Sequence, residues 1–551
     1  MRAAASGLML LVLSWNAFAA GESVVATSHP LAAQAGIEVL KAGGNAMDAA
    51  AAIQFALNVV EPQSSGIGGG AFLLIHRAQT GENLALDARE TAPAAATADQ
   101  FAAHSYAENS QSGLSVGVPG TLAGFAEAQR RWGRLTLAQV LQPAIRLARD
   151  GFAVTPYLAH SLESPRAALQ PETRALFRNA DGQPLREGDW LKQPDLAHTF
   201  ELIAREGPDV FYRGEIARAI VAAQKRSVMG PAGAGRMALA DLSGYRPAWR
   251  KPLVGHYRGA TLVTMPPPSS GGVALLQVLG MLERFPLGKA PGFGARDTNA
   301  VHVTIEALRL AMADRARWLG DPATTTAPLE HLLSPAYLDH LSRTIDPLRR
   351  MPDAGIASER EGTHTTHFSV VDAQGNVVSC TSTVEDAWGS GILVPGYGFL
   401  LNNELTDFNR VPHAGAGDPG ANDVRPGTRP RSSMAPTLVF RGGRWWLAYG
   451  SPGGVTIISS VLETTQALLD DGLPADAAVR LPRYAVLDAE GHTLVERDLP
   501  RPLQEALTAR GHLLKPVDGP IGSVQVVGED PVTHERWGVA DPRRDGTVLR
   551  F

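Results

Sequence analysis

The chain has 551 residues, of which 44% are hydrophobic and 19% charged, and its formal net charge is -5. This composition is that of an ordinary globular protein without the basic surplus that nucleic-acid binding needs, so we expect no nucleic-acid partner. The length suits three or four domains of about 150 residues, or one interleaved α/β body.

The first residues have the pattern of a secretory signal. Arg2 precedes the apolar run Leu8–Leu13, and the small-residue stretch Ala17-Phe18-Ala19 follows. We expect cleavage after Ala19, so residues 1–19 are a predicted signal peptide and the protein is predicted to be exported, periplasmic or secreted. The alternative is a retained membrane anchor, but the apolar run is shorter than the ~20 residues that a span needs. Cys380 is the only cysteine, which excludes an internal disulfide.

Two helices and a hairpin are predicted next. The spacing of apolar residues favours helices over Pro30–Lys41 and Ala46–Val60. Strands at 71–76 and 84–87 flank a glycine-containing turn, and the far end of this hairpin presents Arg89.

The middle of the chain is predicted to be mostly helical. Helical patterns run from residue 121 to about residue 350, interrupted by a strand at 261–265. A polar linker at 351–363 precedes the return of strand signals. Helices followed by hairpins in both halves predict an α+β fold of two stacked sheets covered by helices.

A second hairpin carries the strongest functional signal. Residues 366–372 and 376–383 are rich in β-branched side chains, and the three residues 373–375 between them suit a hairpin turn. Counting outward from that turn brings Thr365 opposite Thr383, within about 5 Å. The sequence therefore predicts two hydroxyls that meet across a ladder.

The string that begins at Thr365 resembles the start of the small subunit of γ-glutamyltransferases, also called glutathione hydrolases, which are N-terminal-nucleophile hydrolases. Seven further motifs follow that family's order over nearly the whole mature chain. The eight strings are 365–372 (TTHFSVVD), 400–408 (LLNNELTDF), 429–434 (RPRSSM), 450–454 (GSPGG), 64–70 (SSGIGGG), 89–93 (RETAP), 118–120 (VPG) and 265–272 (MPPPSSGG).

The resemblance implies a four-layer αββα fold and a precursor that cuts itself between His364 and Thr365. A large subunit of residues 20–364 and a small subunit of residues 365–551 would then form a heterodimer. Neither a cofactor nor a metal ion is expected.

The expected chemistry centres on Thr365. A threonine hydroxyl needs a base, and the α-amino group freed by the cut, with a reference pKa of ~7.7 to 8.0, suits that task near neutral pH. Thr383 is expected to orient the hydroxyl. Gly453 and Gly454 precede a predicted helix, and the resemblance assigns their amides to the oxyanion hole.

The resemblance also implies a pocket for a γ-glutamyl group. Arg89, with Ser432 and Ser433, would hold the α-carboxylate, and Glu404 and Asp407 would hold the α-ammonium. The expected ligands are glutathione and other γ-glutamyl compounds, with water, amino acids or dipeptides as acceptors.

Two departures from the family pattern bear on the substrate. Glu385 stands where many members have asparagine, and we expect it to face the substrate ammonium as a further anion. The loop 409–428 contains no aromatic residue, whereas several relatives carry a tyrosine there, which predicts a more open pocket.

The residues leave three alternative interpretations open. A metal site at His364 and His367 is disfavoured, because residues three apart on a strand face opposite sides and no Cys or carboxylate cluster accompanies them. A glutaryl-cephalosporin-type acylase would keep the fold but leave the acidic residues without an ammonium partner. An unprocessed γ-glutamyl-binding protein would need neither threonine nor the glycine pair.

Overall fold

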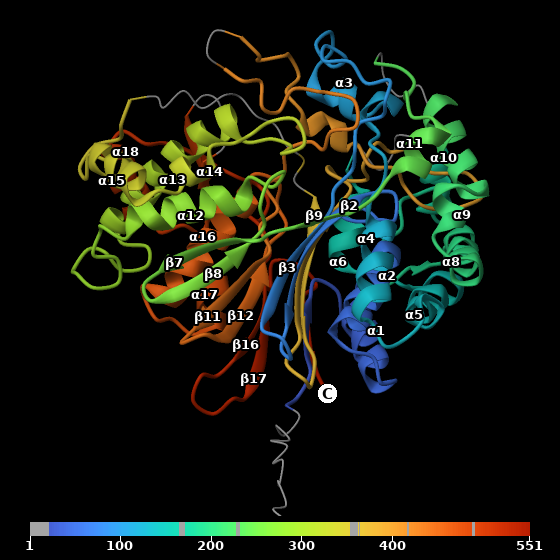
Figure 1. The fold of residues 1–551 in the computed structure, drawn as a ribbon, viewed down its shortest axis with the longest axis horizontal. Helices are drawn as coiled ribbons and strands as arrows, with labels where there is room; N and C mark the ends of the chain where they lie inside the picture. The colour runs from blue at the N-terminus through green and yellow to red at the C-terminus, as the bar shows by residue number, and fades with distance from the viewer. Residues whose placement is uncertain are drawn as a thin grey trace, which may run out of the picture.

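The computed structural model describes residues 21–164, 171–226, 232–352, 362, 364–415, 418–486 and 491–551. The predicted signal at 1–19 and most of the predicted linker at 351–363 lie outside these residues. Figure 1 shows two β-sheets side by side in the middle of the molecule, with helices covering the outer side of each. This is the four-layer αββα arrangement that was expected. No helix in the described ranges is both long and apolar enough to cross a membrane.

The first sheet has seven strands, which pair antiparallel in the order β18-β1-β9-β10-β2-β3-β6. Its central pair is the predicted second hairpin. The strands are β1 (Val24–Thr27), β2 (Gly70–Arg77), β3 (Glu82–Ala88), β6 (Ala248–Arg250), β9 (Thr365–Val371), β10 (Val377–Thr383) and β18 (Thr547–Arg550).

The second sheet has six strands, also antiparallel, in the order β17-β16-β12-β11-β8-β7. They are β7 (Leu253–Tyr257), β8 (Ala260–Thr264), β11 (Thr437–Arg441), β12 (Arg444–Gly450), β16 (Gln525–Glu529) and β17 (Arg536–Ala540). Two small sheets lie outside this pair: β4 (Phe152–Ala153) with β5 (Trp190–Leu191), and β13 (Tyr484–Val486) with β14 (His492–Val495) and β15 (Leu513–Pro516).

Helices form the two outer layers. The layer beside the first sheet contains α1 (Pro30–Lys41), α2 (Ala46–Val60), α4 (Thr121–Trp132), α5 (Leu137–Asp150), α6 (Pro156–Leu162), α8 (Pro194–Glu206), α9 (Asp209–Tyr212), α10 (Glu215–Arg226) and α11 (Leu239–Gly244). The layer beside the second sheet contains α12 (Gly271–Leu282), α13 (Thr298–Trp318), α14 (Leu329–Leu332), α15 (Pro335–Thr344), α16 (Thr456–Leu469), α17 (Ala475–Arg480) and α18 (Arg501–Ala509). Shorter elements are α3 (Tyr106–Ser110), α7 (Pro171–Leu176) and the 3-10 turns η1 (Gly113–Ser115) and η3 (Glu404–Asp407).

Local signals explain the first two helices, whose predicted bounds are confirmed. Pro30 opens α1, and the side chain of His29 accepts from the Leu31 amide. Asn45 and Asp48 form a capping box at the start of α2. Every residue of α2 is buried, because this helix lies between the sheet and the other helices.

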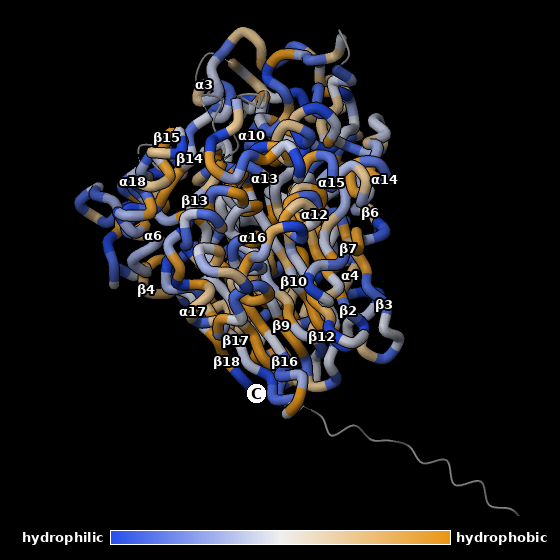
Figure 2. The backbone as a smooth tube through the Cα atoms, turned by 90° about the vertical axis from the view of Figure 1, so that its left-hand side faces the viewer, coloured by the Kyte–Doolittle hydropathy of each residue, from blue (hydrophilic) through white to orange (hydrophobic). Residues whose placement is uncertain are grey.

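Alternation along the strands builds two hydrophobic cores. In β2, Leu73 and Ile75 pack with the first helical layer, whereas Phe72 and Leu74 pack between the sheets. Figure 2 shows apolar residues concentrated along the central strands. Every residue of β9 and β10 is buried, so these strands are covered on both faces.

The register predicted for the β9–β10 hairpin is confirmed, since Thr365 pairs with Thr383. Gly375 has a φ of 86°, which a glycine adopts without strain, and the Asp372 amide donates to the Asn376 carbonyl at 3.0 Å to close the turn.

The prediction for residues 121–350 is confirmed for the helices but incomplete for the strands. The strand expected at 261–265 is β8 (Ala260–Thr264), and it pairs with β7. Sequence reasoning missed β4, β5, β6 and β7. The first three have only two or three residues, and Pro252 interrupts the pattern directly before β7. The chain passes from the first sheet to the second at this point.

Candidate active site

Thr365 and Thr383 lie side by side at the end of the β9–β10 ladder, and both are buried. The Thr383 hydroxyl donates to the His364 carbonyl at 3.0 Å and accepts from the Glu385 amide at 2.8 Å. This differs from the expected contact with the Thr365 hydroxyl. The interaction polarises the carbonyl of the peptide bond that precedes Thr365, where an attacking nucleophile would place negative charge.

Close packing of the two sheets holds this end of the hairpin. The Ser379 hydroxyl donates to the Tyr449 carbonyl at 3.1 Å, and a Cβ added to Gly450 would lie 2.4 Å from the His367 ring. These two contacts show that β12 runs in the same direction as β10. The residues after Gly450 therefore continue toward the Thr365–Thr383 pair.

The glycine pair follows at that point. Gly453 and Gly454 have φ values of 132° and 57°, and a Cβ on Gly453 would lie 2.4 Å from the Thr456 hydroxyl. Glycine is required at Gly453 for both reasons. Helix α16 begins at Thr456, so the pair lies directly before a helix N-terminus, where backbone amides can bind developing negative charge.

The two histidines beside Thr365 have separate surroundings. His367 is buried and shares hydrogen bonds with Thr381 at 2.9 Å and Ser369 at 3.1 Å. Burial lowers the pKa of His367 to about 3, so the ring is neutral near pH 7. His364 instead lies 3.5 Å from Asp386.

Arg89 is the buried centre of the predicted substrate pocket. It follows β3, and its guanidinium donates to Glu404, to Asp407 at 2.5 Å, and to the carbonyls of Pro430 and Arg431 at 3.3 and 3.0 Å. Burial acts to lower the pKa of Arg89, but Glu404 and Asp407 together raise it. The residues expected to hold opposite ends of a ligand are thus paired with one another, because buried charges need partners.

Ser432 and Ser433 follow the two carbonyls that bind Arg89. The Ser432 hydroxyl accepts from the Met434 amide at 3.2 Å. The Ser433 hydroxyl accepts from Arg315 of α13 at 3.0 Å. The serines thus directly follow the two residues whose carbonyls bind Arg89, and Ser433 also contacts a second buried arginine, Arg315.

Glu385 accepts three hydrogen bonds. Tyr106 of α3 donates through its hydroxyl at 2.6 Å, and the Asn403 side chain and the Gly362 amide also donate. Burial raises the pKa of Glu385, and the nearby carboxylates, led by Asp407, raise it further. Its φ of 83° is rare for a non-glycine residue and is typical of strain at functional sites.

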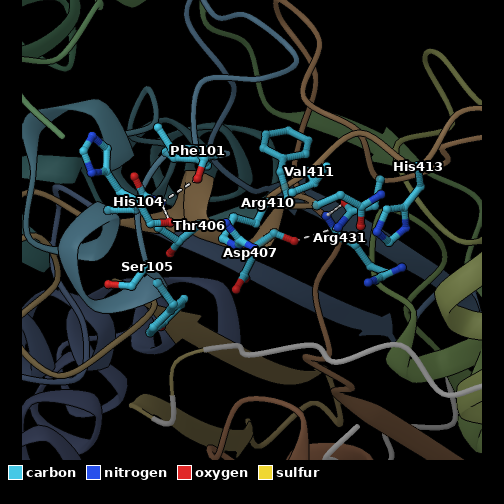
Figure 3. Close-up of a pocket in the computed structure, with 15 residues that line it drawn as sticks. Phe101, His104, Ser105, Thr406, Asp407, Arg410, Val411, His413 and Arg431 are labelled. Atoms are coloured by element: carbon cyan, nitrogen blue, oxygen red, sulfur yellow. Dashed lines mark hydrogen bonds between the residues drawn. The ribbon is translucent and has the colours of Figure 1, made fainter.

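A cavity of about 620 Å³ adjoins this cluster. Figure 3 shows Phe101, His104, Ser105 and Thr406 together on one part of its wall, Arg431 and His413 on another, and Asp407 between them. Arg410 donates to the Ala102 carbonyl at 2.9 Å and so ties the loop after η3 to the loop before α3. A more open pocket was predicted because the loop 409–428 contains no aromatic residue. The hydrogen bond of Arg410 nevertheless attaches this loop to the segment before α3.

One group of possible metal ligands occurs in the described part of the chain, away from the predicted site residues. His302, Glu306 and His512 bring ligand atoms within 4.8 Å of one another. The two rings share a hydrogen bond of 2.7 Å, and Arg309 donates to both Glu306 oxygens at 3.1 Å. Burial lowers the pKa of His512, and the positive charges of Arg309, Arg350 and Arg510 lower it further. The same charges would repel a divalent metal ion.

Comparison with known proteins decides the family. Residues 32–551 match the family described as Gamma-glutamyltranspeptidase. The chain belongs to the gamma-glutamyltranspeptidase family. The resemblance inferred from the eight motifs is confirmed.

Individual members of the gamma-glutamyltranspeptidase family and solved structures agree. The chain is 40% identical over 553 residues to the glutathione hydrolase proenzyme of Bacillus subtilis (strain 168), covering 96% of this chain and 91% of that protein. It is 39% identical over 539 residues to the acylase ACY 1 proenzyme of Pseudomonas sp. (strain V22), covering 96% and 93%. The crystal structure of cephalosporin acylase from Bacillus halodurans matches with a TM-score of 0.82 at 31% identity, covering 96% of each chain. The α+β sandwich is therefore confirmed, and the chain is an enzyme of this family.

Three residues around the site were missed from sequence: Tyr106, Arg315 and Arg544. Their partners lie 279, 118 and 179 positions away in the chain. No local pattern marks any of them, so only the folded chain could identify them.

Proposed function

We propose that the protein is a self-processing γ-glutamyltransferase and glutathione hydrolase with Thr365 as its nucleophile. The observation that carries the proposal is the hydrogen bond from Thr383 to the His364 carbonyl, one residue before a threonine at the end of the ladder. Family membership supports the same reaction class, because relatives are named glutathione hydrolase proenzymes.

The first reaction is the cut. The Thr365 hydroxyl oxygen attacks the His364 carbonyl carbon, the peptide C–N bond breaks, and the hydroxyl proton passes to the nitrogen that becomes the new α-amino group. Water then hydrolyses the resulting ester, which leaves a His364 carboxylate and a free hydroxyl. The products are residues 20–364 and 365–551, which stay together as a heterodimer because β1 and β9 pair across the cut.

Turnover repeats this chemistry on a substrate. The α-amino group of Thr365 takes the hydroxyl proton, and the oxygen attacks the γ-carbonyl carbon of the donor. Amides at Gly453 and Gly454 stabilise the oxyanion. The proton goes to the departing amine, a γ-glutamyl ester remains on Thr365, and water or the amine of an amino acid or dipeptide releases it.

The charged cluster supports a γ-glutamyl donor such as glutathione. The α-carboxylate of the donor would compete with Glu404 and Asp407 for Arg89, assisted by the Ser432 and Ser433 hydroxyls. The α-ammonium would then take Glu404 and Asp407 as partners, with Glu385 as a third anion nearby. Exchange of ion-pair partners avoids leaving any of these buried charges alone.

An acylase acting on a glutaryl side chain is the second candidate, favoured by the 39% identity to the acylase ACY 1 proenzyme. A glutaryl group carries a carboxylate but no ammonium. It would engage Arg89 and displace Glu404 and Asp407 without giving them a new cation, which is costly in a buried site. The charges therefore favour the γ-glutamyl donor.

Mass spectrometry of the denatured protein tests the cut. We expect two chains, one beginning at Thr365, in the wild type and in a Thr547→Ala control, which alters a strand threonine of β18 outside the site. The Thr365→Ala variant should remain one chain. A single chain in all three would refute the proposal and favour a binding protein. We also propose export, which the N-terminus of the large fragment would reveal as Ala20.

Rates with matched γ-glutamyl and glutaryl amides of one leaving group decide the substrate. The γ-glutamyl amide should react faster, and Glu404→Gln should reduce that preference. A faster glutaryl reaction would replace the transferase assignment by the acylase.

A further inference from the structure

The nucleophile strand β9 is incomplete on one side. Strand β1 pairs with β9 only as far as Thr27, which lies opposite Phe368. Residues 365–367 extend beyond that pair, so this edge of β9 lacks a neighbouring strand just where Thr365 lies. Its backbone groups on this edge need other partners.

The hydrogen-bond pattern shows which groups face the open edge. The Asp372 amide donates to the Asn376 carbonyl, so even-numbered residues of β9 bond toward β10 and odd-numbered residues toward β1. In a strand, the N–H and C=O of one residue point to the same side. The nitrogen and the carbonyl oxygen of Thr365 therefore both face the open edge.

Arg544 takes the place of the missing strand. Its guanidinium donates to the Thr365 carbonyl at 2.5 Å and lies 4.6 Å from the centre of the Tyr157 ring. The loop that carries Arg544 leads into β18, which pairs with β1. A cation held between an aromatic face and a carbonyl has little freedom, because both contacts fix its plane.

A buried polar group lies next to this contact. Ser28 shares a hydrogen bond of 2.7 Å with the Thr366 hydroxyl and donates to Glu61 at 2.9 Å. Glu61 is 1% exposed at the end of α2. Burial raises the pKa of Glu61, and the charge of Arg544 opposes that shift, so the two groups interact electrostatically.

We propose that Arg544 is a positioning residue for the nucleophile, which holds the backbone of Thr365 from the open edge of β9 and keeps its amino group a free base. The inference rests on the proposed role of Thr365 and adds to it. Arg544 contacts the nucleophile residue and not the substrate, so its effect passes through the geometry and the charge state of Thr365.

The charge of Arg544 lies close enough to the Thr365 nitrogen to affect its pKa. Bond lengths place the nitrogen of Thr365 within about 4 Å of its own carbonyl oxygen, so the donating nitrogen of Arg544 lies within about 6.5 Å of the amino group. A like charge at that distance disfavours an ammonium ion and lowers its pKa. Glu61 acts in the opposite direction but reaches Thr366 only through Ser28. The other titratable groups around this end of the hairpin include Tyr157, His364, Glu385, Asp386 and Asp545.

The test compares Arg544→Gln, Arg544→Lys and the control Arg550→Gln, which removes a half-exposed arginine of β18. Cutting is followed by mass spectrometry, and kcat/KM with a γ-glutamyl amide is measured from pH 5 to 10. In Arg544→Gln we expect slower cutting. We also expect the acid limb of the kcat/KM profile to move up by about one pH unit, which is a tenfold loss of kcat/KM at any pH on that limb. Arg544→Lys keeps the charge and should restore the limb, and the control should match the wild type.

Each outcome has a separate meaning. An Arg544→Gln protein that cuts and titrates as the wild type does overturns the positioning role, while a wild type that never cuts at Thr365 overturns the proposed function instead. If circular dichroism shows that Arg544→Gln does not fold, Tyr157→Leu replaces it, because this change removes the ring under the guanidinium and keeps Arg544 itself. In Tyr157→Leu, a smaller upward shift of the acid limb of kcat/KM supports the proposal, and an unchanged acid limb refutes it.

Discussion

Removing Arg89 should expose the cost of two buried carboxylates. Its side chain is 1% exposed, and those of Glu404 and Asp407 are 1% and 6% exposed. Breaking a buried ion pair from one side costs about 3 to 5 kcal/mol, because the remaining charge has no partner. For a folded body of about 530 residues, 4 kcal/mol lowers Tm by about 4 °C. We expect that shift in Arg89→Met.

The assay is thermal unfolding at pH 8, followed by far-ultraviolet circular dichroism in a Thr365→Ala background that keeps every sample as one chain. Adding Glu404→Gln to Arg89→Met should recover about half of the loss, since it removes one of the two uncompensated anions. The loss should also shrink at pH 5, where the carboxylates can take up protons.

A surface pair gives the matched control. Arg130 is 69% exposed and lies 2.9 Å from Glu127, so Arg130→Met should change Tm by less than about 1 °C. An Arg89→Met protein that stays within 1 °C of its parent would refute this expectation, and so would a further fall of Tm on adding Glu404→Gln. Either result would mean that water or other groups already compensate the two carboxylates.

Three other properties are open to measurement. Tyr106→Phe removes a donor to Glu385, so KM for γ-glutamyl donors should rise about tenfold with kcat nearly unchanged; a fall in kcat alone would contradict a binding role. Burial raises the pKa of Glu90 to about 7, so its contribution to stability is complete below the ordinary value of 4.5 and is lost as pH rises through 7. Glu90→Gln should therefore flatten the fall of Tm between pH 5 and pH 8.5, and an unchanged slope would exclude this assignment. The Cys380 thiol is buried and its pKa is raised, so a thiol reagent should label it only after denaturation, and rapid labelling of native protein would show that this part of β10 opens.

Local physics accounts for what the sequence predicted well. The bounds of α1 and α2 follow from caps and helical spacing within a few residues. The Thr365–Thr383 pairing follows from the length of a single turn, because a two-residue period propagates register along a ladder. The motif order was sufficient to identify the family.

Contacts between segments far apart in the chain could not be predicted from local sequence patterns. The sequence placed Arg89 and the acidic pair in one pocket, but the structure pairs them directly, because charges removed from water must be compensated within the protein. Thr383 was expected to contact the Thr365 hydroxyl, yet it donates to the His364 carbonyl, since backbone geometry at the strand end sets its direction.

By itself the sequence determined the hairpin, its register, the family and the set of charged residues, all of which depend on neighbours along the chain or on motif order. Only the tertiary structure showed that β9 extends beyond its pairing with β1 and that Arg544 binds the Thr365 carbonyl at that unpaired edge. It also showed the hydrogen bond from Tyr106 to Glu385. The physical reason is that unpaired backbone groups and buried charges find partners by proximity in space, which sequence separation does not encode.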